Sequence, residues 1–370
     1  MNSSASRSST SNLSAIVLAA GQGTRMKSTL PKPAHPVCGR PMVNWVLRAL
    51  KQSNATHIVV VVGHGSEQVT AAIGSEELGV PVSFVEQRSQ RGTGDAASVG
   101  LTGLADDETD RADVIILPGD TPLLEADTIA TFVDYHRSQD SVCTIMTAIL
   151  DDPTGYGRIV RNRHGSVERI VEHKDASPEE LEINEVNAGI YCLRQSLLAP
   201  ALRRITPNNA QGEYYLTDVA EVLRSSGYPI HAHAVAQPDQ TNGVNDRAQL
   251  MDAELRLRDR LSQEWMKTGV SILDPAGTVI DAQVSLGADI IIQPGCSLTG
   301  STVVGDGSVI GPGAHLSSCA IGAGVTVLDS HVGADAVIGA GSRVGPYAVV
   351  EPGAEVDGQS VVAPFSTVTS

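Results

Sequence analysis

An aliphatic residue recurs at almost every sixth position through the last third of the chain. Fifteen positions follow this pattern with only two five-residue steps: Leu286, Ile292, Leu298, Val304, Ile310, Leu316, Ile321, Val327, Val332, Ile338, Val344, Val350, Val356, Val362 and Val368. A six-residue step predicts one flat side of a triangular coil, because one aliphatic side chain points inward while small residues turn the corner. Coils stacked at the strand spacing would give about five turns and a prism roughly 25 Å long.

The repeat resembles the hexapeptide left-handed parallel β-helix. Residues 269–370 contain one basic residue, Arg343, and nine acidic ones, a net charge of −8. This shift in composition marks a domain boundary. The chain has 370 residues, more than a single hydrophobic core usually serves, so two domains are expected.

Composition also excludes several classes of protein. The net charge of −16 argues against a nucleic-acid partner, which would need a basic face. No apolar run reaches the length of a membrane span, so no membrane partner is expected. The five cysteines are far apart and form no CxxC pair, which favours buried, reduced thiols in a cytoplasmic protein over disulfides or a zinc site.

The first two-thirds of the chain alternates short apolar runs with helical patterns. Runs at 15–19, 58–62 and 114–117 predict buried strands, and an amphipathic stretch at 42–53 predicts a helix. Strand–helix alternation indicates an α/β domain with a Rossmann-like sheet. The predicted organisation is a disordered Ser-rich tail at 1–12, an α/β domain at 13–245, a linker helix at 246–268 and a left-handed β-helix at 269–370.

The strongest local signal is the segment LAAGQGTRM at 18–26, followed by LPKP at 30–33. Small residues after a strand let backbone N–H groups approach an anion closely, as a nucleoside triphosphate requires. Arg25 and Lys32 supply the opposite charge. No GK[ST] follows, so this is not a Walker loop, and it is not the GxGxxG of dinucleotide sites either.

These segments belong to a longer series of motifs in order along the chain: GRPMVNWVL, EQRSQRGTGDA, PGDTPLL, DDPTGYGRI, IVEHKDA, NEVNAGIY, GEYYLTD and GVNDR. From about Leu13 to about Ser370, the chain resembles the bacterial bifunctional N-acetylglucosamine-1-phosphate uridylyltransferase / glucosamine-1-phosphate N-acetyltransferase family. The resemblance implies an α/β nucleotidyltransferase domain with a Rossmann-like mixed sheet, followed by a left-handed parallel β-helix of hexapeptide repeats. It also implies a cytoplasmic UDP-N-acetylglucosamine diphosphorylase that supplies a cell wall precursor.

The resemblance implies roles for individual residues. Arg25 and Lys32 would be catalytic, and Asp120 and Asn245 would hold Mg²⁺, which suits a site of few protein oxygens. Pro118 stands where the family has an aromatic residue. The residues implied to bind the nucleotide are Ala19, Ala20, Gly21, Gly23, Gln87, Gly92 and Thr93.

Gly157, Glu172 and Asn187 match the family's positions for the N-acetylated sugar. Thr217 and Tyr215 would shape the same side, although core packing is an equal alternative for Tyr215. The implied reaction joins UTP and N-acetylglucosamine 1-phosphate, releasing pyrophosphate. Alternatives are another sugar phosphate or base, and a catalytically inactive regulatory subunit, against which the presence of Arg25, Lys32 and Asp120 argues.

The resemblance also implies a homotrimer built through the β-helix. The family's second activity, acetyl transfer from acetyl-CoA, is expected to be absent. The chain stops at Ser370, before the family's catalytic histidine and acetyl-CoA contacts, and Glu351 replaces an arginine that binds sugar phosphate. We expect the β-helix to act as a trimerisation device, with a shortened form of a bifunctional parent as the alternative.

Overall fold

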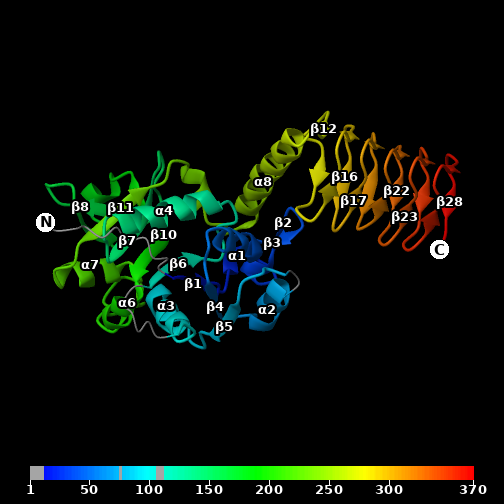
Figure 1. Cartoon of the computed structure of the whole chain (residues 1–370). Coiled ribbons are helices and arrows are strands. Elements are labelled where there is room, and N and C mark those ends of the chain that lie inside the picture. The colour runs from blue at the N-terminus through cyan, green and yellow to red at the C-terminus, as the bar shows by residue number, and fades with distance from the viewer. Residues whose placement is uncertain (1–11, 75–76, 106–111) are drawn as a thin grey trace, which may run out of the picture. The chain divides into compact units, whose positions relative to one another are not determined.

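The structure is a computed structural model that describes residues 12–74, 77–105 and 112–370 (Figure 1). The described chain divides into two compact units. The first contains the residues up to His35 and Pro41–Gln249, and the second contains Pro36–Arg40 and Leu250–Ser370. Of the predicted tail at 1–12, only Asn12 is described, and its carbonyl accepts a hydrogen bond from the Asp113 amide. Within the described ranges, no helix is both long enough and apolar enough to cross a membrane.

The first unit is built on a mixed sheet in the order β11-β7-β10-β6-β1-β4-β5, with β8 attached to β10 and β9 attached to β8. Its strands are β1 (Leu13–Leu18), β4 (His57–Val62), β5 (Val82–Glu86), β6 (Asp113–Pro118), β7 (Cys143–Ile149), β8 (Arg158–Arg161), β9 (Val167–Val171), β10 (Glu185–Arg194) and β11 (Ile230–Ala234). Parallel pairing joins β6, β1, β4 and β5, whereas β10 is antiparallel to both β6 and β7. The Rossmann-like mixed sheet expected from the sequence is therefore present.

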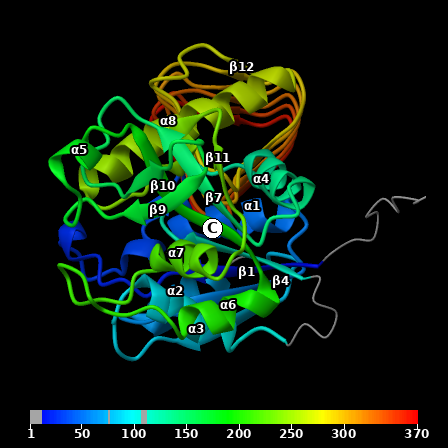
Figure 2. The same cartoon turned by 90° about the vertical axis from the view of Figure 1, so that its left-hand side faces the viewer.

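Helices cover both faces of this sheet. They are α1 (Met42–Gln52), α2 (Ser66–Gly74), α3 (Thr93–Leu101), α4 (Ala126–Ser138), α5 (Pro178–Leu181), α6 (Gln195–Leu202) and α7 (Asp218–Ser225), with 3-10 turns η1 (Thr24–Met26), η2 (Lys32–Ala34) and η3 (Pro238–Thr241). Figures 1 and 2 show α1 and α4 on one side of the central strands and α3 and α6 on the other. One buried cluster unites the sheet with α1, α2 and α4, and a second unites it with α3, α6 and α7.

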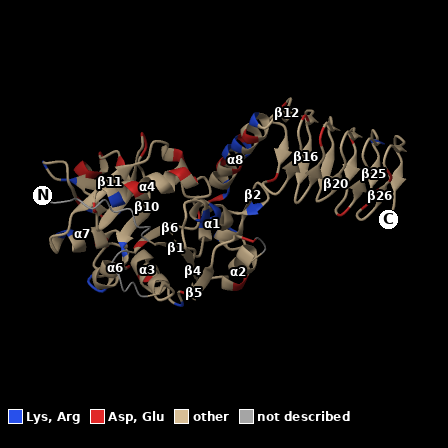
Figure 3. Cartoon of the chain, viewed as in Figure 1, with Lys and Arg blue, Asp and Glu red and all other residues tan. Residues whose placement is uncertain are grey.

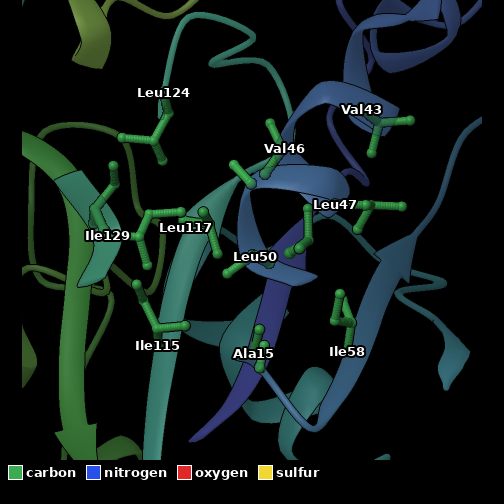
Figure 4. Close-up of a cluster of buried hydrophobic side chains, with 14 of the residues drawn as sticks. Ala15, Val43, Val46, Leu47, Leu50, Ile58, Ile115, Leu117, Leu124 and Ile129 are labelled. Carbon is green, nitrogen blue, oxygen red and sulfur yellow. The ribbon is translucent and has the colours of Figure 1, made fainter. Parts of the chain in front are cut away.

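The α1 side of the core explains the strand and helix patterns in the sequence. Leu47 and Leu50 of α1 meet Ile115 and Leu117 of β6 in a cluster without solvent exposure (Figure 4). Adjacent β residues point to opposite faces, so continuous apolar runs such as Ile58–Val62 fill both cores.

The second unit is a coil of short parallel strands arranged in three sheets, as in a left-handed β-helix. Its strands are β12 (Ser271–Ile272), β13 (Val279–Ile280), β14 (Ser285–Leu286), β15 (Ile291–Ile292), β16 (Ser297–Thr299), β17 (Val303–Val304), β18 (Val309–Ile310), β19 (His315–Ser317), β20 (Ala320–Ile321), β21 (Thr326–Val327), β22 (His331–Val332), β23 (Val337–Ile338), β24 (Arg343–Val344), β25 (Val349–Val350), β26 (Glu355–Val356), β27 (Val361–Val362) and β28 (Thr367–Val368). Figure 3 shows little blue along these coils, because Arg343 is the one Lys or Arg in 269–370.

Every aliphatic position of the repeat is the inward residue of one of these strands. Ile292, Ile310, Val327, Val344 and Val362 stack along one face in register, and all are buried. The fold begins before the regular pattern, because Ile272 and Ile280 are also buried inward residues. The turn between β12 and β13 makes the step from Ile272 to Ile280 longer than six residues, so the six-residue pattern does not include the first coil.

The short hairpin of β2 (Pro36–Val37) and β3 (Arg40–Pro41) brings Cys38 and Gly39 into the second unit, beside α8 (Arg247–Lys267). The Cys38 amide donates to Glu254 Oε2 at 2.6 Å, and the Cys38 carbonyl accepts from the Ala282 amide at 2.9 Å. A Cβ on Gly39 would lie 2.5 Å from Asp281, so no larger residue fits without movement. Burial raises the pKa of the Cys38 thiol to about 12, which makes it a packing group.

Candidate active site

The site begins in the loop that follows β1. The Ala19 amide donates to the Val61 carbonyl at 2.9 Å, so the loop leaves the sheet directly after Leu18. Gly23 has a φ of +59°, and a Cβ there would lie 2.7 Å from Cβ of Lys32. Both features require glycine, and they let the Lys32 segment pack against the loop.

Lys32 lies between two residues that the sequence assigns to a metal. Its ammonium donates to Asp120 Oδ2 in a close ion pair and to Asn245 Oδ1 at 3.2 Å. Asp120 follows β6, at the carboxyl end of a strand parallel to β1, where α/β sheets place their ligands. The lysine and aspartate side chains are only 15% and 16% exposed, so this cluster of charges is largely withdrawn from water.

The backbone holds the Asn245 segment against Asp120. The Val244 amide donates to the Asp120 carbonyl at 2.9 Å, and the Asn245 amide donates to Gln249 Oε1 at 2.7 Å. A Cβ on Gly243 would lie 3.5 Å from Asp120 Oδ1, so this segment runs close beside the carboxylate.

This arrangement fits a magnesium ion. One cation, the Lys32 ammonium, already lies within reach of both a carboxylate and an amide oxygen. Hard oxygen donors of this kind suit Mg²⁺, which binds one or two protein groups and completes its shell with water and phosphate. Within the described ranges, no group of three or more His, Cys, Asp or Glu side chains could hold a metal ion, so these residues form no metal site built from protein ligands alone.

A second group of predicted residues lies at the start of α3. Gln87 is 5% exposed, and its Nε2 donates to the Gly92 carbonyl at 3.2 Å and to Asp95 Oδ2 at 2.8 Å. Gly92 has a φ of +111°, and a Cβ there would lie 2.5 Å from the Tyr214 carbonyl. Thr93 Oγ1 accepts from the Leu216 amide at 3.0 Å, which ties α3 to the 213–217 segment.

The third group lies beside β8 and β10. The Asn187 amide donates to the Gly157 carbonyl at 2.8 Å, and Asn187 Nδ2 donates to the Tyr191 hydroxyl at 2.7 Å. A Cβ on Gly157 would lie 3.4 Å from Glu172 Oε2, so these three residues are neighbours. Burial raises the pKa of Glu172, and the charges of Asp175 and Asp218 raise it further.

One pocket of about 450 Å³ brings the three groups together. The predicted residues that line it are Ala19, Ala20, Gly21, Lys32, Gln87, Gly92, Thr93, Asp120, Glu172 and Asn187. Gly23, Gly157 and Asn245 are not in its lining. Gly23 and Asn245 lie beside Lys32, and Gly157 lies beside Glu172. Arg25 is exposed on η1 and is also outside the lining.

The pocket includes residues that sequence reasoning did not single out. Gln90 is one of them, and its Nε2 donates to the Ala20 carbonyl at 2.6 Å. Gln90 belongs to the EQRSQRGTGDA motif, and its position in that motif was the sequence signal that could have identified it as a site residue. Tyr191 and Gly189 also line the pocket and were not singled out. Of the other residues named from the sequence, Pro118 and Thr217 line the pocket, whereas Tyr215 is buried at 7% exposure and is not in the lining.

An α/β sheet carries small residues after β1, a largely buried lysine–aspartate pair at the end of β6 and one pocket that both of them line. These features together are typical of a nucleotide-dependent transferase. Residues 14–269 match the profile of the nucleotidyl transferase family, and the chain belongs to that family.

Individual relatives agree. The chain is 45% identical over 334 residues to "Bifunctional protein GlmU" of Brevibacillus brevis. This alignment covers 89% of this chain and 71% of that protein. It is 44% identical over 338 residues to the protein of the same name from Corynebacterium efficiens, which covers 90% of this chain and 69% of that protein. The resemblance stated from the motifs is confirmed, and so is the expectation of a nucleotidyltransferase enzyme.

Proposed function

We propose that the chain is a UDP-N-acetylglucosamine diphosphorylase, which transfers the uridylyl group of UTP to N-acetylglucosamine 1-phosphate. The observation that carries the proposal is the single pocket in which Lys32, Asp120 and Gln87 lie together with Glu172 and Asn187. These groups divide the pocket into a phosphate part, a base part and a sugar part. Membership of the nucleotidyl transferase family supports the class of reaction.

The base part suits uracil. Both hydrogens of Gln87 Nε2 are engaged within the protein, by Gly92 and Asp95, so its Oε1 is the atom available to a ligand. Uracil presents one N–H donor between two carbonyls, and an amide oxygen can accept from that donor. Cytosine has an acceptor at the same ring position and would leave Gln87 Oε1 without a donor.

The sugar part suits a neutral, hydroxyl-rich ring with an amide. We assign the ring hydroxyls to Glu172, whose carboxyl group accepts hydrogen bonds, and the N-acetyl group to the neighbourhood of Asn187 and Gly157. Asn187 is held by Gly157, Gly189 and Tyr191, so its side-chain amide is fixed before the sugar binds. Such fixed polar groups discriminate between ligands because a wrong ligand leaves them without partners.

In the proposed reaction, a phosphate oxygen of the sugar attacks the α-phosphorus of UTP. The bond from that phosphorus to the bridging oxygen breaks, and pyrophosphate leaves with the electron pair. The attacking phosphate is already anionic at neutral pH, so catalysis depends on positioning and on charge neutralisation. Lys32 would stabilise the negative charge that develops on the phosphates, and Arg25, on the loop of small residues, would neutralise phosphate charge from the open side.

Mg²⁺ held by Asp120 and Asn245 would screen the repulsion between the two anionic substrates. The Lys32 ammonium would then give up its contacts to these two residues and face the phosphates. A lysine that is flexible along its four-carbon chain can make that change without movement of the backbone.

We assign the catalytic domain to 13–245, the linker helix to 246–268 and a trimerisation role to the β-helix at 269–370. The flat sheet faces support assembly into a homotrimer, because closed symmetry is the usual outcome of self-association. The expectation of a cytoplasmic enzyme rests on the five buried cysteine thiols, which a reducing compartment preserves.

We further propose that these coils carry no acetyl transfer. Acetyl-CoA brings several phosphate charges, and 269–370 offers only Arg343 as a cation among nine acidic residues. Glu351 is itself the residue that follows β25, and its charge would repel a sugar phosphate.

A comparison of pyrophosphate release across substrates tests the assignment. UTP with N-acetylglucosamine 1-phosphate should give the highest kcat/KM. Replacing the sugar phosphate by glucose 1-phosphate, or UTP by thymidine triphosphate, should give a much lower kcat/KM. A preference for thymidine triphosphate with glucose 1-phosphate would contradict the proposed substrates while leaving the enzyme class intact. No pyrophosphate with any pair would contradict the proposal as a whole.

A further inference from the structure

A second cavity lies in the first unit, outside the pocket described above. Its volume is about 510 Å³, and it is enclosed by the β8–β9 turn, the end of α7 and the start of β11. No residue in its lining also lines the pocket of Lys32 and Asp120. Helix α7, strand β9 and strand β11 pack against one another beside it.

Basic side chains gather in the lining of this cavity. The lining includes Arg161, Arg224 and two histidines, His164 and His231, and it contains no Asp or Glu. Glutamates outside the lining pair with both arginines, so binding of an anionic ligand depends on the N–H donors that these pairs leave open.

The arginines differ in how far they are engaged. Arg161 forms a bidentate pair with Glu185 at 2.7 Å and donates to the Gly165 carbonyl at 2.8 Å, so its charge is largely balanced. Arg224 approaches Glu168 only to 3.6 Å, beyond hydrogen-bond distance, and its side chain is 40% exposed. Arg224 is therefore the cation with the most donors left for a ligand.

Asn162 adds a neutral donor to the lining. Its Oδ1 accepts from the His164 and Ser166 amides, at 2.9 and 3.1 Å, which leaves its Nδ2 to donate elsewhere. His231 adds no donor. Ser141 donates to the Cys143 carbonyl, so His231 Nδ1, at 3.0 Å, is the donor to Ser141 Oγ, and Nε2 of the neutral ring is an acceptor. Burial lowers the pKa of His231, so it contributes as a neutral ring.

We propose that this cavity is a second ligand site, which binds a small organic phosphate through Arg224 and Asn162. Arginine pairs with phosphate through parallel N–H donors, and Arg224 lines the same cavity as the amide donor of Asn162. A volume of about 510 Å³ is that of a metabolite site and far exceeds what inorganic phosphate would fill. The phosphate would take the Arg224 end, and a sugar-sized body would lie against Tyr135 and Tyr228.

Hydrogen–deuterium exchange with ribose 5-phosphate tests the proposal on the full chain. Binding should slow exchange in 161–167 and 224–232, with ribose giving no protection and inorganic phosphate giving less than the phosphate ester. Protection by ribose alone, or only around Asp120 and Lys32, would overturn the site. Equal protection by inorganic phosphate would overturn its assignment to an organic phosphate.

Matched arginine variants make the test specific. With Arg224→Ala, about tenfold more ribose 5-phosphate should be needed for the same protection from exchange, because one charge-assisted contact is lost. Arg224→Lys should retain most of it, and Arg203→Ala, an exposed arginine at the end of α6 outside the cavity, should leave it unchanged. Equal protection in Arg224→Ala and the parent protein would overturn the role of Arg224, and an unchanged unfolding temperature excludes a folding defect as the cause of any loss.

Discussion

Lys32 and Asp120 stand 88 positions apart in the sequence and form a close ion pair at the carboxyl end of β6. The pair is more than four-fifths buried, and Asn245 lies within hydrogen-bond distance of the same ammonium. The Lys32 ammonium lies between the two oxygen atoms that we propose as metal ligands, so this position already holds one positive charge. The predictions on catalysis follow from this relationship.

Replacing the carboxylate should abolish metal-dependent turnover. Asp120→Asn keeps the shape of the side chain but removes the only carboxylate assigned to Mg²⁺, so turnover should fall by orders of magnitude while the fold is retained. A magnesium titration of the pyrophosphate release rate measures the effect. EDTA should also abolish activity of the parent protein. Asp134→Asn, at an exposed position of α4, is the matched control. Full activity of Asp120→Asn at ordinary magnesium concentrations would refute the assignment.

Removing the lysine charge should affect the chemical step more than binding. Lys32→Met should lower kcat by roughly 100-fold or more, the cost of one lost donor at a developing negative charge. Lys32→Arg should keep part of the activity because it keeps the charge. Lys51→Met, on the exposed end of α1, serves as the control. Steady-state kinetics with separate kcat and KM values give the answer, and a change in KM alone would show that Lys32 only binds substrate.

Crowded carboxylates near the sugar part should make stability depend on pH. Burial, together with the charges of Glu221 and Asp175, raises the pKa of Asp218 to about 6. The folded state therefore favours protonated Asp218, so its contribution to stability is present below pH 4 and is lost as the pH rises through 6. Asp218→Asn should stabilise the protein at pH 8 by up to about 1 kcal/mol, a value reduced for solvent screening, and have little effect at pH 4.

Thermal unfolding at both pH values measures this difference. Asp134→Asn, away from the acidic cluster, should show no such dependence on pH. A destabilisation by Asp218→Asn that is the same at pH 4 and pH 8 would contradict the electrostatic explanation.

The outward side of the coils should mediate self-association. Val303 and Val337 are 49% and 43% exposed and point outward from the same sheet, with Ala320 between them in register. Light scattering should give a mass of three chains. Val337→Glu should shift the mass toward one chain, and Thr326→Glu, on another sheet, should not if the valine face forms the contact. A mass of one chain for the parent protein would rule out the trimer.

Acetyl transfer should be undetectable. Mixing the protein with glucosamine 1-phosphate and acetyl-CoA should release free thiol only at the uncatalysed rate, because the coils present almost no cations to the phosphates of either substrate. The same preparation must release pyrophosphate in the uridylyl assay as a control. Thiol release above background at micromolar protein would contradict the prediction.

Several features of the fold follow from short-range sequence patterns. The aliphatic repeat identified the inward residue of each strand from β14 to β28, because every coil repeats the same local requirement. Apolar runs likewise located β1, β4 and β6. By contrast, the first coil was not predicted, since the step from Ile272 to Ile280 breaks the period, and nothing local indicated that β10 runs antiparallel with a bulge between Asn187 and Tyr191.

The candidate site was predictable in its residue types and not in its contacts. The motifs named ten residues that line one pocket, yet the pairing of Lys32 with Asp120 and Asn245 depends on long-range topology, which local patterns do not encode. Arg25 is exposed on η1, and its contact with a phosphate stays a prediction. The hydrogen bond from Gln90 to the Ala20 carbonyl could not be predicted either, because it joins two loops that are far apart in the sequence.

Phosphorus NMR of a single reaction mixture tests the central claim most directly. The protein, magnesium, UTP and N-acetylglucosamine 1-phosphate should convert the UTP signals into those of a nucleotide diphosphate sugar and pyrophosphate in a one-to-one ratio. Asp120→Asn should leave the substrates unchanged over the same period. Unchanged UTP with the parent protein, or its conversion into UDP and inorganic phosphate, would contradict uridylyl transfer to the sugar phosphate.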